Sequence, residues 1–266
     1  MPEGDTVWRT ARQLHRALSG KVLTRTDFRV PSYATWDLAG ATVTETVSRG
    51  KHLLTRIDPA AADGGWTVHS HLKMEGSWQV LTPGQRWPRP GHTARVVLET
   101  ADAVAVGFLL GIVEVLARNR EEEVVGHLGP DLLGPDWDPD EAVRRLREQP
   151  ERAVKEALLD QTRLAGLGNI YSNELCFISG VAPETRVADV PDLPRMVARA
   201  HLLLDQNRRR TVPSTTGELA RGRTMWVYRR AGEPCRRCGT TIRQAMVGDD
   251  GEERTTWWCP SCQPVA

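Results

Sequence analysis

Long apolar runs are missing from this sequence of 266 residues. No stretch approaches the roughly 20 consecutive apolar residues that a membrane-spanning helix needs. The first residues, Met-Pro-Glu-Gly-Asp, place acid where a secretory signal peptide carries base. Internal repeats and low-complexity tracts are also absent. We therefore expect an ordinary globular protein of the cytoplasm, with no membrane contact.

Lysine is scarce, and the other basic side chains are those of arginine. The only lysines are Lys21, Lys51, Lys73 and Lys155. Arginine replaces lysine readily on a solvated surface, so a bias in composition explains the loss of most lysines. Those that remain are candidates for places where a compact ammonium group is needed.

The net charge of +1 hides an uneven distribution. Acid gathers at 121–123 and 131–141, whereas the stretch 221–243 holds a single acidic residue, Glu233, among many arginines. These are Arg221, Arg223, Arg229, Arg230, Arg236, Arg237 and Arg243. Such a local excess attracts phosphate. A solvated arginine-rich surface would give the same pattern.

The first structural element is predicted to be a helix over Thr6–Leu18, with Asp5 or Thr6 as its N-cap and Gly20 at its end. Short β-rich runs separated by turn residues follow, and their number and spacing indicate an all-β sandwich or barrel. The predicted strands are Lys21–Val30, Ala41–Ser48, His52–Ile57, Trp66–Leu72, Ser77–Leu81, Thr93–Leu98, Val104–Leu109 and Ile112–Leu116.

The composition changes after the last predicted strand. An acidic stretch with proline and glycine, from Glu121 to Asp140, indicates a linker. The expected helices beyond it are Glu141–Glu148, Arg152–Gln161, Ile170–Ser179 and Val190–Asn207, and a strand pair with cysteines follows from Thr224. We expect an α+β protein with four parts: a β-sandwich domain (1–117), a linker (118–140), a helical domain (141–223) and a zinc finger (224–266).

Four of the five cysteines form two Cys-x-x-Cys pairs, Cys235 with Cys238 and Cys259 with Cys262. Two such turns can complete a tetrahedron of thiolates around one structural zinc ion. Two disulfides are the rival explanation, which a cytoplasmic setting disfavours. The fifth cysteine, Cys176, lies in an apolar helical run and is expected in the core.

The zinc hairpin itself suggests a binding surface. Arg254 is expected in the loop of this hairpin, five residues before Cys259. A rigid hairpin can insert one such side chain into a groove at low entropic cost. The hairpin and its arginines therefore indicate DNA as a target.

The N-terminal tetrapeptide offers a nucleophile. Removal of Met1 would expose Pro2 as a secondary amine, and the reference pKa of an α-amino group, about 7.7–8.0, leaves a useful fraction unprotonated. Such an amine can attack a sugar C1′ and form an iminium. Glu3 beside it could act as the general acid on the sugar-ring oxygen. Proline at position two is also common in proteins without this chemistry.

Five segments in order closely resemble the formamidopyrimidine-DNA glycosylase/endonuclease VIII family over essentially the whole chain. They are the Met-Pro-Glu-Gly start, Arg49-Gly50-Lys51 with Leu53-Leu54, 127–131 (His-Leu-Gly-Pro-Asp), 160–169 (Asp-Gln-Thr-Arg-Leu-Ala-Gly-Leu-Gly-Asn) and the terminal cysteine motif. The combination is far more specific than any one of its members.

This resemblance implies a two-layered β-sandwich behind the first helix, a helix-two-turns-helix domain with a zinc finger, and damaged DNA in the cleft between. Pro2 would be the nucleophile, Glu3 the acid that opens the sugar, and Lys51 a lysine that assists catalysis and contacts phosphate. The remaining roles fall to Asn169 and Arg254, which would bind phosphate, Glu174, which would organise the active site, and Lys155, a lysine of the glycosylase branch.

Excision requires the target base to leave the stack, which costs a few kcal/mol and calls for phosphate clamps and an apolar wedge. Met74 stands at the family's wedge position, in what is expected to be an exposed turn between Lys73 and Glu75; a core methionine is the alternative.

Two features place the chain within the family. Gly4 is typical of the endonuclease VIII branch, and the segment 107–112 lacks the arginines of the formamidopyrimidine branch. Thr6 stands where family members commonly carry a second glutamate, and a displacement by one position turns a helical side chain by about 100°, so Asp5 is no simple substitute.

The sequence therefore predicts a monomeric, nucleoid-associated DNA glycosylase and abasic-site lyase. Pro2 would excise oxidised pyrimidines through a Schiff base, and β,δ-elimination would then cleave the strand. A binder of damaged DNA, either without catalysis or with lyase activity alone, is the alternative.

Overall fold

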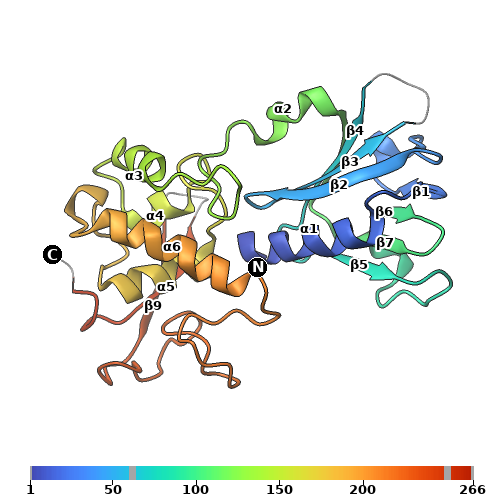
Figure 1. Ribbon diagram of the computed structural model, residues 1–266. Coiled ribbons are helices and arrows are strands. Elements are labelled where there is room, and N and C mark those ends of the chain that lie inside the picture. The colour runs from blue at the N-terminus through green and yellow to red at the C-terminus, as the bar shows by residue number, and fades with distance from the viewer. Residues whose placement is uncertain (1, 60–63, 249–252, 265–266) are drawn as a thin grey trace. The chain divides into compact units, whose positions relative to one another are not determined.

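The computed structural model describes residues 2–59, 64–248 and 253–264. Within them the chain forms two compact units (Figure 1). The first consists of residues 2 and 6–127, and the second of residues 3–5 and 128–264. The short segment 3–5 thus belongs to the second unit, although helix α1, Gly4–Leu18, continues from it into the first. The predicted removal of Met1 lies outside the described residues.

The first unit is a sandwich of two antiparallel sheets of four strands each. One sheet has the order β1-β6-β7-β5 and the other β2-β3-β4-β8. The bounds are β1 Arg25–Phe28, β2 Thr42–Arg49, β3 His52–Asp58, β4 Trp66–His71, β5 Ser77–Leu81, β6 Ala94–Glu99, β7 Val104–Phe108 and β8 Ile112–Ala117. The predicted sandwich is confirmed. The first strand is shorter than predicted, since Val22 forms only an isolated bridge with Thr42.

Helix α1 closes the core of this unit. Its residues Val7, Ala11, Leu14 and Leu18 recur at helical spacing and pack with buried side chains of both sheets. The helix begins at Gly4 and not at Thr6, so the predicted N-cap is wrong. Asp5 lies inside the first turn, because the chain before it is held by hydrogen bonds to another segment.

The second unit is helical. Its helices are α3 Pro139–Arg147, α4 Val154–Leu159, α5 Asn169–Ser179 and α6 Leu193–Asn207. Asp138 and Asp192 cap α3 and α6 by accepting backbone N–H bonds, and Gly180 ends α5 in the left-handed conformation. Asp192 is the reason that α6 begins three residues later than predicted.

The segment expected as a linker has structure of its own. It contains α2, Glu122–Val125, and the division between the units falls directly after His127. Leu128, Asp131 and Leu132 are buried, and Asp131 forms a parallel bridge with Ala165. Short 3-10 helices occupy Pro31–Tyr33, Gly91–Thr93, Arg118–Arg120 and Val187–Asp189.

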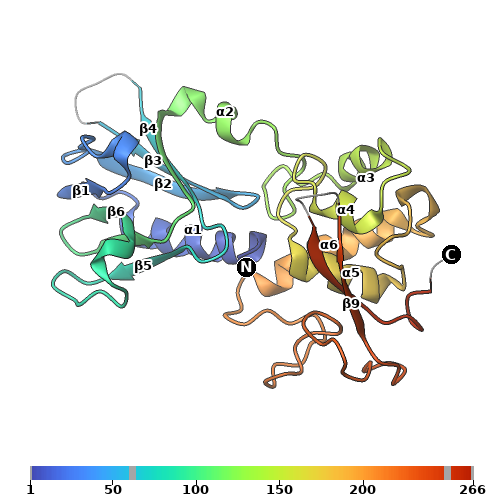
Figure 2. The same ribbon diagram turned by 180° about the vertical axis from the view of Figure 1, so that it is seen from behind.

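The C-terminal strand pair consists of β9, Arg243–Val247, and β10, Arg254–Trp258. It begins later than predicted, because the chain from Arg208 to Ile242 forms turns and a bridge between Pro234 and Thr241. The hairpin lies beside α5 (Figure 2). Phe177 of α5 packs there with Val227, Ile242 and Trp257. Among the described residues, no helix combines the length and apolarity needed to cross a bilayer.

Candidate active site and metal centre

Glu3 is held at the N-terminus of α5. Its carboxylate accepts hydrogen bonds from the backbone N–H groups of Ile170 at 2.6 Å, Gly168 at 2.7 Å and Tyr171 at 3.4 Å. These are N–H groups that a helix start leaves without a partner inside the helix, and the helix dipole favours an anion there. Glu3 is only 1% exposed, so its position is fixed.

Glycine is required where this carboxylate meets the helix. A Cβ atom at Gly168 would lie 2.6 Å from the Cδ atom of Glu3. Gly166 adopts a φ of +111°, and its carbonyl accepts a hydrogen bond from the Gly4 N–H at 2.9 Å. Gly168 therefore leaves room for the Glu3 carboxylate, and Gly166 binds the backbone of the next residue, Gly4.

Gln161 supports the same turn and was not singled out from the sequence. Its side-chain oxygen accepts from the Gly166 N–H at 3.1 Å, and its amide nitrogen donates to the carbonyls of Leu159 and Leu167. Gln161 belongs to the 160–169 motif, and this was the feature of the sequence that could have indicated its role.

Asp5 is buried with a tyrosine that the sequence also left unassigned. The Tyr171 hydroxyl donates a 2.8 Å hydrogen bond to the Asp5 carboxylate, and both residues are 1% exposed. Burial, followed by the charge of Asp5, raises the pKa of Tyr171, so the hydroxyl keeps its proton. Asp5 is therefore held by Tyr171 and does not take the direction of the side chain at position 6.

Asn169 connects the motif to the C-terminal hairpin. Its amide nitrogen donates to the Thr255 carbonyl at 2.9 Å, and Thr255 follows Arg254 directly. Arg254 itself is exposed and is the first residue of β10, paired with Val247. Its predicted place in the hairpin loop is wrong by this one step. The structure nevertheless brings Asn169 and Arg254 to the same end of α5.

Lys155 of α4 lies near enough to Arg254 to feel its charge, and its ammonium group is largely desolvated. It is 2% exposed, and burial lowers its pKa to about 8. The nearby Cys176 and Glu156 act in the opposite direction, whereas Arg254 lowers the pKa further. Cys176 is fully buried in the core, as expected.

Glu174 organises a loop. Its carboxylate is completely buried and accepts 2.8 Å hydrogen bonds from the backbone N–H groups of Trp226, Val227 and Tyr228, and another from the Thr215 hydroxyl. Burial raises the pKa of this carboxyl, which the four donors counteract. The observed hydrogen bonds of this carboxylate are therefore with the segment 215–228.

Lys51 and Met74 belong to turns of the first unit. Lys51 follows Gly50 in a two-residue hairpin between β2 and β3, and Gly50 has the positive φ, +56°, that primed hairpin turns require. Met74 is 65% exposed in the turn between β4 and β5, so the alternative of a core methionine is wrong, and the wedge role stays a prediction.

Cys235, Cys238, Cys259 and Cys262 form a metal-binding cluster, with all four sulfur atoms within 4.8 Å of one another. The Sγ atoms of Cys238 and Cys259 are 3.5 Å apart, and those of Cys235 and Cys262 are 3.9 Å apart. All four cysteines are free thiols, so the disulfide alternative is wrong. The separations suit four sulfurs placed about 2.3 Å from one tetrahedral ion.

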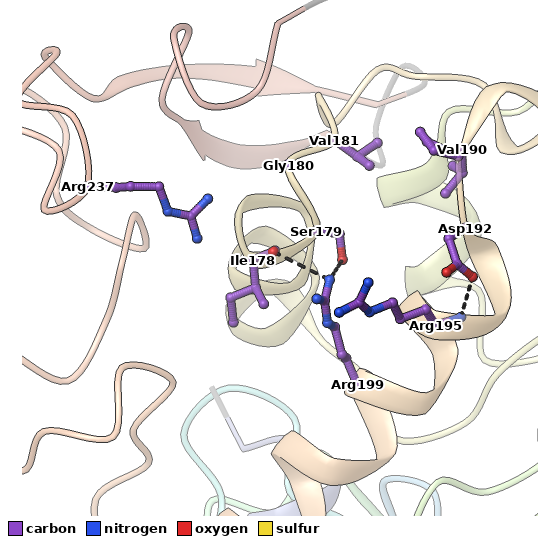
Figure 3. Close-up of a pocket in the computed structure, with 10 residues that line it drawn as sticks. Ile178, Ser179, Gly180, Val181, Val190, Asp192, Arg195, Arg199 and Arg237 are labelled. Atoms are coloured by element: carbon purple, nitrogen blue, oxygen red, sulfur yellow. Dashed lines mark hydrogen bonds between the residues drawn. The ribbon is translucent and has the colours of Figure 1, made fainter.

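A separate pocket of about 320 Å³ lies at the C-terminal end of α5 (Figure 3). Arg195, Arg199 and Arg237 line it, and Arg199 donates to the Ile178 carbonyl. None of the predicted site residues lines this pocket.

Comparison with known proteins agrees with this architecture. The family model of the formamidopyrimidine-DNA glycosylase N-terminal domain matches residues 1–109, and that of the formamidopyrimidine-DNA glycosylase H2TH domain matches residues 128–206. The complex of Lactococcus lactis Fpg with DNA containing an abasic site has the same fold, with a TM-score of 0.79 at 24% identity, over 99% of this chain and 100% of that one.

Two relatives are similar along their whole length. "Probable endonuclease 8 2" of Streptomyces coelicolor is 56% identical, over 99% of this chain and 94% of its own. "DNA-(apurinic or apyrimidinic site) lyase Nei2" of Mycolicibacterium smegmatis is 53% identical, over 100% of both. With these matches at both ends of the chain, the protein belongs to the formamidopyrimidine-DNA glycosylase/endonuclease 8 family.

Proposed function

We propose that the protein is a DNA glycosylase and abasic-site lyase of base excision repair, acting as a monomer in the cytoplasm on nucleoid DNA. The observation that carries the proposal is the fixed carboxylate of Glu3, which follows Pro2 in the chain and is bound by three backbone N–H groups of the glycine motif.

Pro2 and Glu3 divide the chemistry between them. The unprotonated amine of Pro2 attacks C1′ as the damaged base departs. Glu3, held as a carboxylate by its N–H donors, takes the proton that the proline nitrogen must lose and passes it to the sugar-ring oxygen. The ring opens and the iminium forms, which acidifies C2′: loss of a C2′ proton expels the 3′-phosphate in β-elimination. Loss of the C4′ proton of the conjugated iminium then expels the 5′-phosphate in δ-elimination.

Phosphate contacts would hold the DNA around this chemistry. Lys51 is proposed to assist catalysis and to contact phosphate near the lesion, and Asn169 and Arg254 to bind the backbone beside it. Asn169 uses one amide hydrogen on Thr255, so its second remains for a phosphate oxygen. Met74 would fill the space left by the extruded base, and oxidised pyrimidines are the proposed substrates.

Zinc is proposed as the resident ion of the four-cysteine cluster. Four thiolates leave no open coordination position, so the ion would fold the hairpin and take no part in the reaction. Glu174 and Lys155 are proposed to support the site from within the helical unit, Glu174 by fixing the 215–228 loop.

Lyase activity without base excision is the second candidate. It is favoured by Thr6, which removes the second glutamate common in the family, and by the Mycolicibacterium smegmatis relative, which is named as an abasic-site lyase.

Strand-cleavage assays separate these functions. Matched duplexes would carry one oxidised pyrimidine, one abasic site or no lesion. A glycosylase and lyase cleaves the first two and leaves a one-nucleotide gap with phosphate at both ends. Cleavage of the abasic duplex alone would establish lyase activity without base excision. Binding without cleavage of either duplex would rule out both the glycosylase and the lyase activity.

A further inference from the structure

Three side chains form a hydrogen-bonded chain on one face of the β2-β3-β4-β8 sheet. His69 of β4 lies opposite Glu114 of β8, and its Nδ1 is 2.8 Å from the Glu114 Oε2 atom. Its Nε2 is 2.8 Å from Nδ1 of His52, the first residue of β3. His69 is 2% exposed, so the middle of the chain is buried.

The carboxylate fixes the tautomers of both rings. A carboxylate only accepts hydrogen bonds, so Nδ1 of His69 must carry the proton. Neutral His69 then accepts at Nε2, which requires Nδ1 of His52 to be the donor. Burial lowers the pKa of His52 to about 3, helped by His71, His69, His127 and Lys73, so the ring is neutral at physiological pH.

This chain ends at the Lys51 turn. His52 follows Lys51 directly and pairs across the hairpin with Arg49 and across the sheet with His71. The rings of His52 and His71 are 5.0 Å apart, and His71 accepts a 2.9 Å hydrogen bond from the Lys73 N–H. The same cluster thus touches the turn that carries Met74.

Neutral rings suit a place crowded with cations. Burial lowers the pKa of His71 to about 4, with Lys73 and Lys51 as further causes. A protonated ring here would repel the ammonium group of Lys51, which is proposed to assist the reaction. Because Glu114 fixes the tautomers, His52 donates a hydrogen bond to His69 as a neutral ring. It can therefore stabilise the hairpin without adding charge.

We propose that Glu114, His69 and His52 are positioning residues that hold the Lys51 hairpin in its working geometry. The proposal rests on the role of Lys51 given above. A misplacement of about 1 Å at a reacting group can cost on the order of 100-fold in rate. A brace one residue away is expected to cost less, about tenfold, in the chemical step.

Glu114→Ala and Glu114→Gln make the sharpest pair of variants. Glu114 is 41% exposed, so both should fold. Alanine removes the acceptor, and single-turnover cleavage of an abasic-site duplex should fall about tenfold, with affinity for a tetrahydrofuran duplex changed less than about twofold. Glutamine still accepts from His69 through its side-chain oxygen and should restore most of the rate.

Glu45→Ala is the matched control. Glu45 is a carboxylate of the same sheet with 40% exposure, and it pairs with Arg56 instead of a histidine. Its loss should leave the cleavage rate unchanged. Nitrogen-15 spectra of the histidines give an independent readout: His52 and His69 should both be protonated at Nδ1, and His52 should lose this preference in Glu114→Ala.

Three results would overturn the proposed positioning role of Glu114, His69 and His52. They are an unchanged cleavage rate in Glu114→Ala, an equal loss of rate in Glu114→Gln, or protonation of His52 at Nε2. Lys51→Ala separates this failure from that of the proposed function. If Lys51→Ala abolishes cleavage while Glu114→Ala leaves the cleavage rate unchanged, only the positioning role of Glu114, His69 and His52 is wrong. If Lys51→Ala cleaves normally, the proposed role of Lys51 is wrong, and the positioning role that depends on it is wrong as well.

Discussion

Glu3 combines a structural and a proposed chemical task in one side chain. Three backbone N–H groups converge on its carboxylate, and its burial leaves no room for another orientation. A carboxylate is the only side chain of this length that accepts at both oxygens. The contacts that fix Glu3 within the helical unit also hold the carboxylate that we propose as the proton carrier beside Pro2.

The first prediction follows from these contacts. In Glu3→Gln, an amide N–H2 group faces a backbone N–H, so one buried donor loses its acceptor, at a cost of about 1–3 kcal/mol of stability. Base excision should be lost even at temperatures where the variant is folded, because the proton can no longer move. Urea unfolding and lesion cleavage measure the two effects, with Glu45→Gln as control. A variant as stable and as active as the parent would contradict both assignments.

At the scale of elements, patterns that depend on near neighbours were predictable. Helical spacing from Val7 to Leu18 and the alternating burial of β8, where Val113 and Val115 are buried and their neighbours are less so, follow from local geometry. The family motif also identified Glu3, Asn169 and Glu174 as residues of interest. What each side chain contacts was not predictable in this way.

Long-range register explains the difference. His52, His69 and Glu114 lie 17 and 45 residues apart along the chain and meet only because β3, β4 and β8 are neighbours in one sheet. The sequence around each of these three residues does not predict that it contacts the other two. The start of α1 was predicted wrongly for a similar reason, since Gly4 bonds to Gly166 far along the chain.

The second prediction concerns the pH dependence of the β2-β3-β4-β8 sheet. The folded-state pKa values of His52, about 3, and His71, about 4, lie below the reference value of 6.5. The unfolded chain therefore binds protons that the folded chain refuses, and stability present above pH 6.5 is lost as the pH falls toward 4. His52→Leu should reduce the loss of unfolding free energy between pH 7 and pH 5, whereas His92→Leu, an exposed control, should not. An identical pH dependence in parent and His52→Leu would show that His52 is not held neutral.

The third prediction concerns the cysteine hairpin. Cys235 and Cys259 are buried beside Phe177 and Trp257, so we expect folding of the hairpin to depend on the zinc ion that is proposed to join the four sulfurs. Cys259→Ser should lose bound zinc and weaken binding to a tetrahydrofuran duplex, while the β-sandwich keeps its circular-dichroism signal. Cys176→Ala, which removes a thiol outside the cluster, should retain zinc. Normal DNA affinity in Cys259→Ser would show that the hairpin is dispensable.

For the whole molecule, charge placement matters more than net charge. The formal charge is only +1, yet Arg254 is exposed beside Asn169 at one end of α5. The fourth prediction is that Arg254→Ala weakens binding and reduces the slope of log affinity against log salt by about one. Arg186→Ala, which removes an arginine already paired with Glu151 and Asp189, should change neither quantity. An unchanged slope in Arg254→Ala would exclude a phosphate contact there.

The identity of the attacking amine decides the account as a whole. Lys155 is the serious rival to Pro2, because its lowered pKa of about 8 approaches that of an α-amino group.

Borohydride trapping on an abasic-site duplex, followed by mass spectrometry of the cross-linked peptide, is the most direct measurement. It should find the reduced sugar on the nitrogen of Pro2 in a chain that has lost Met1, and Pro2→Gly should reduce the adduct sharply. An adduct on Lys155 or Lys51, or active enzyme that retains Met1, would contradict the proposed chemistry.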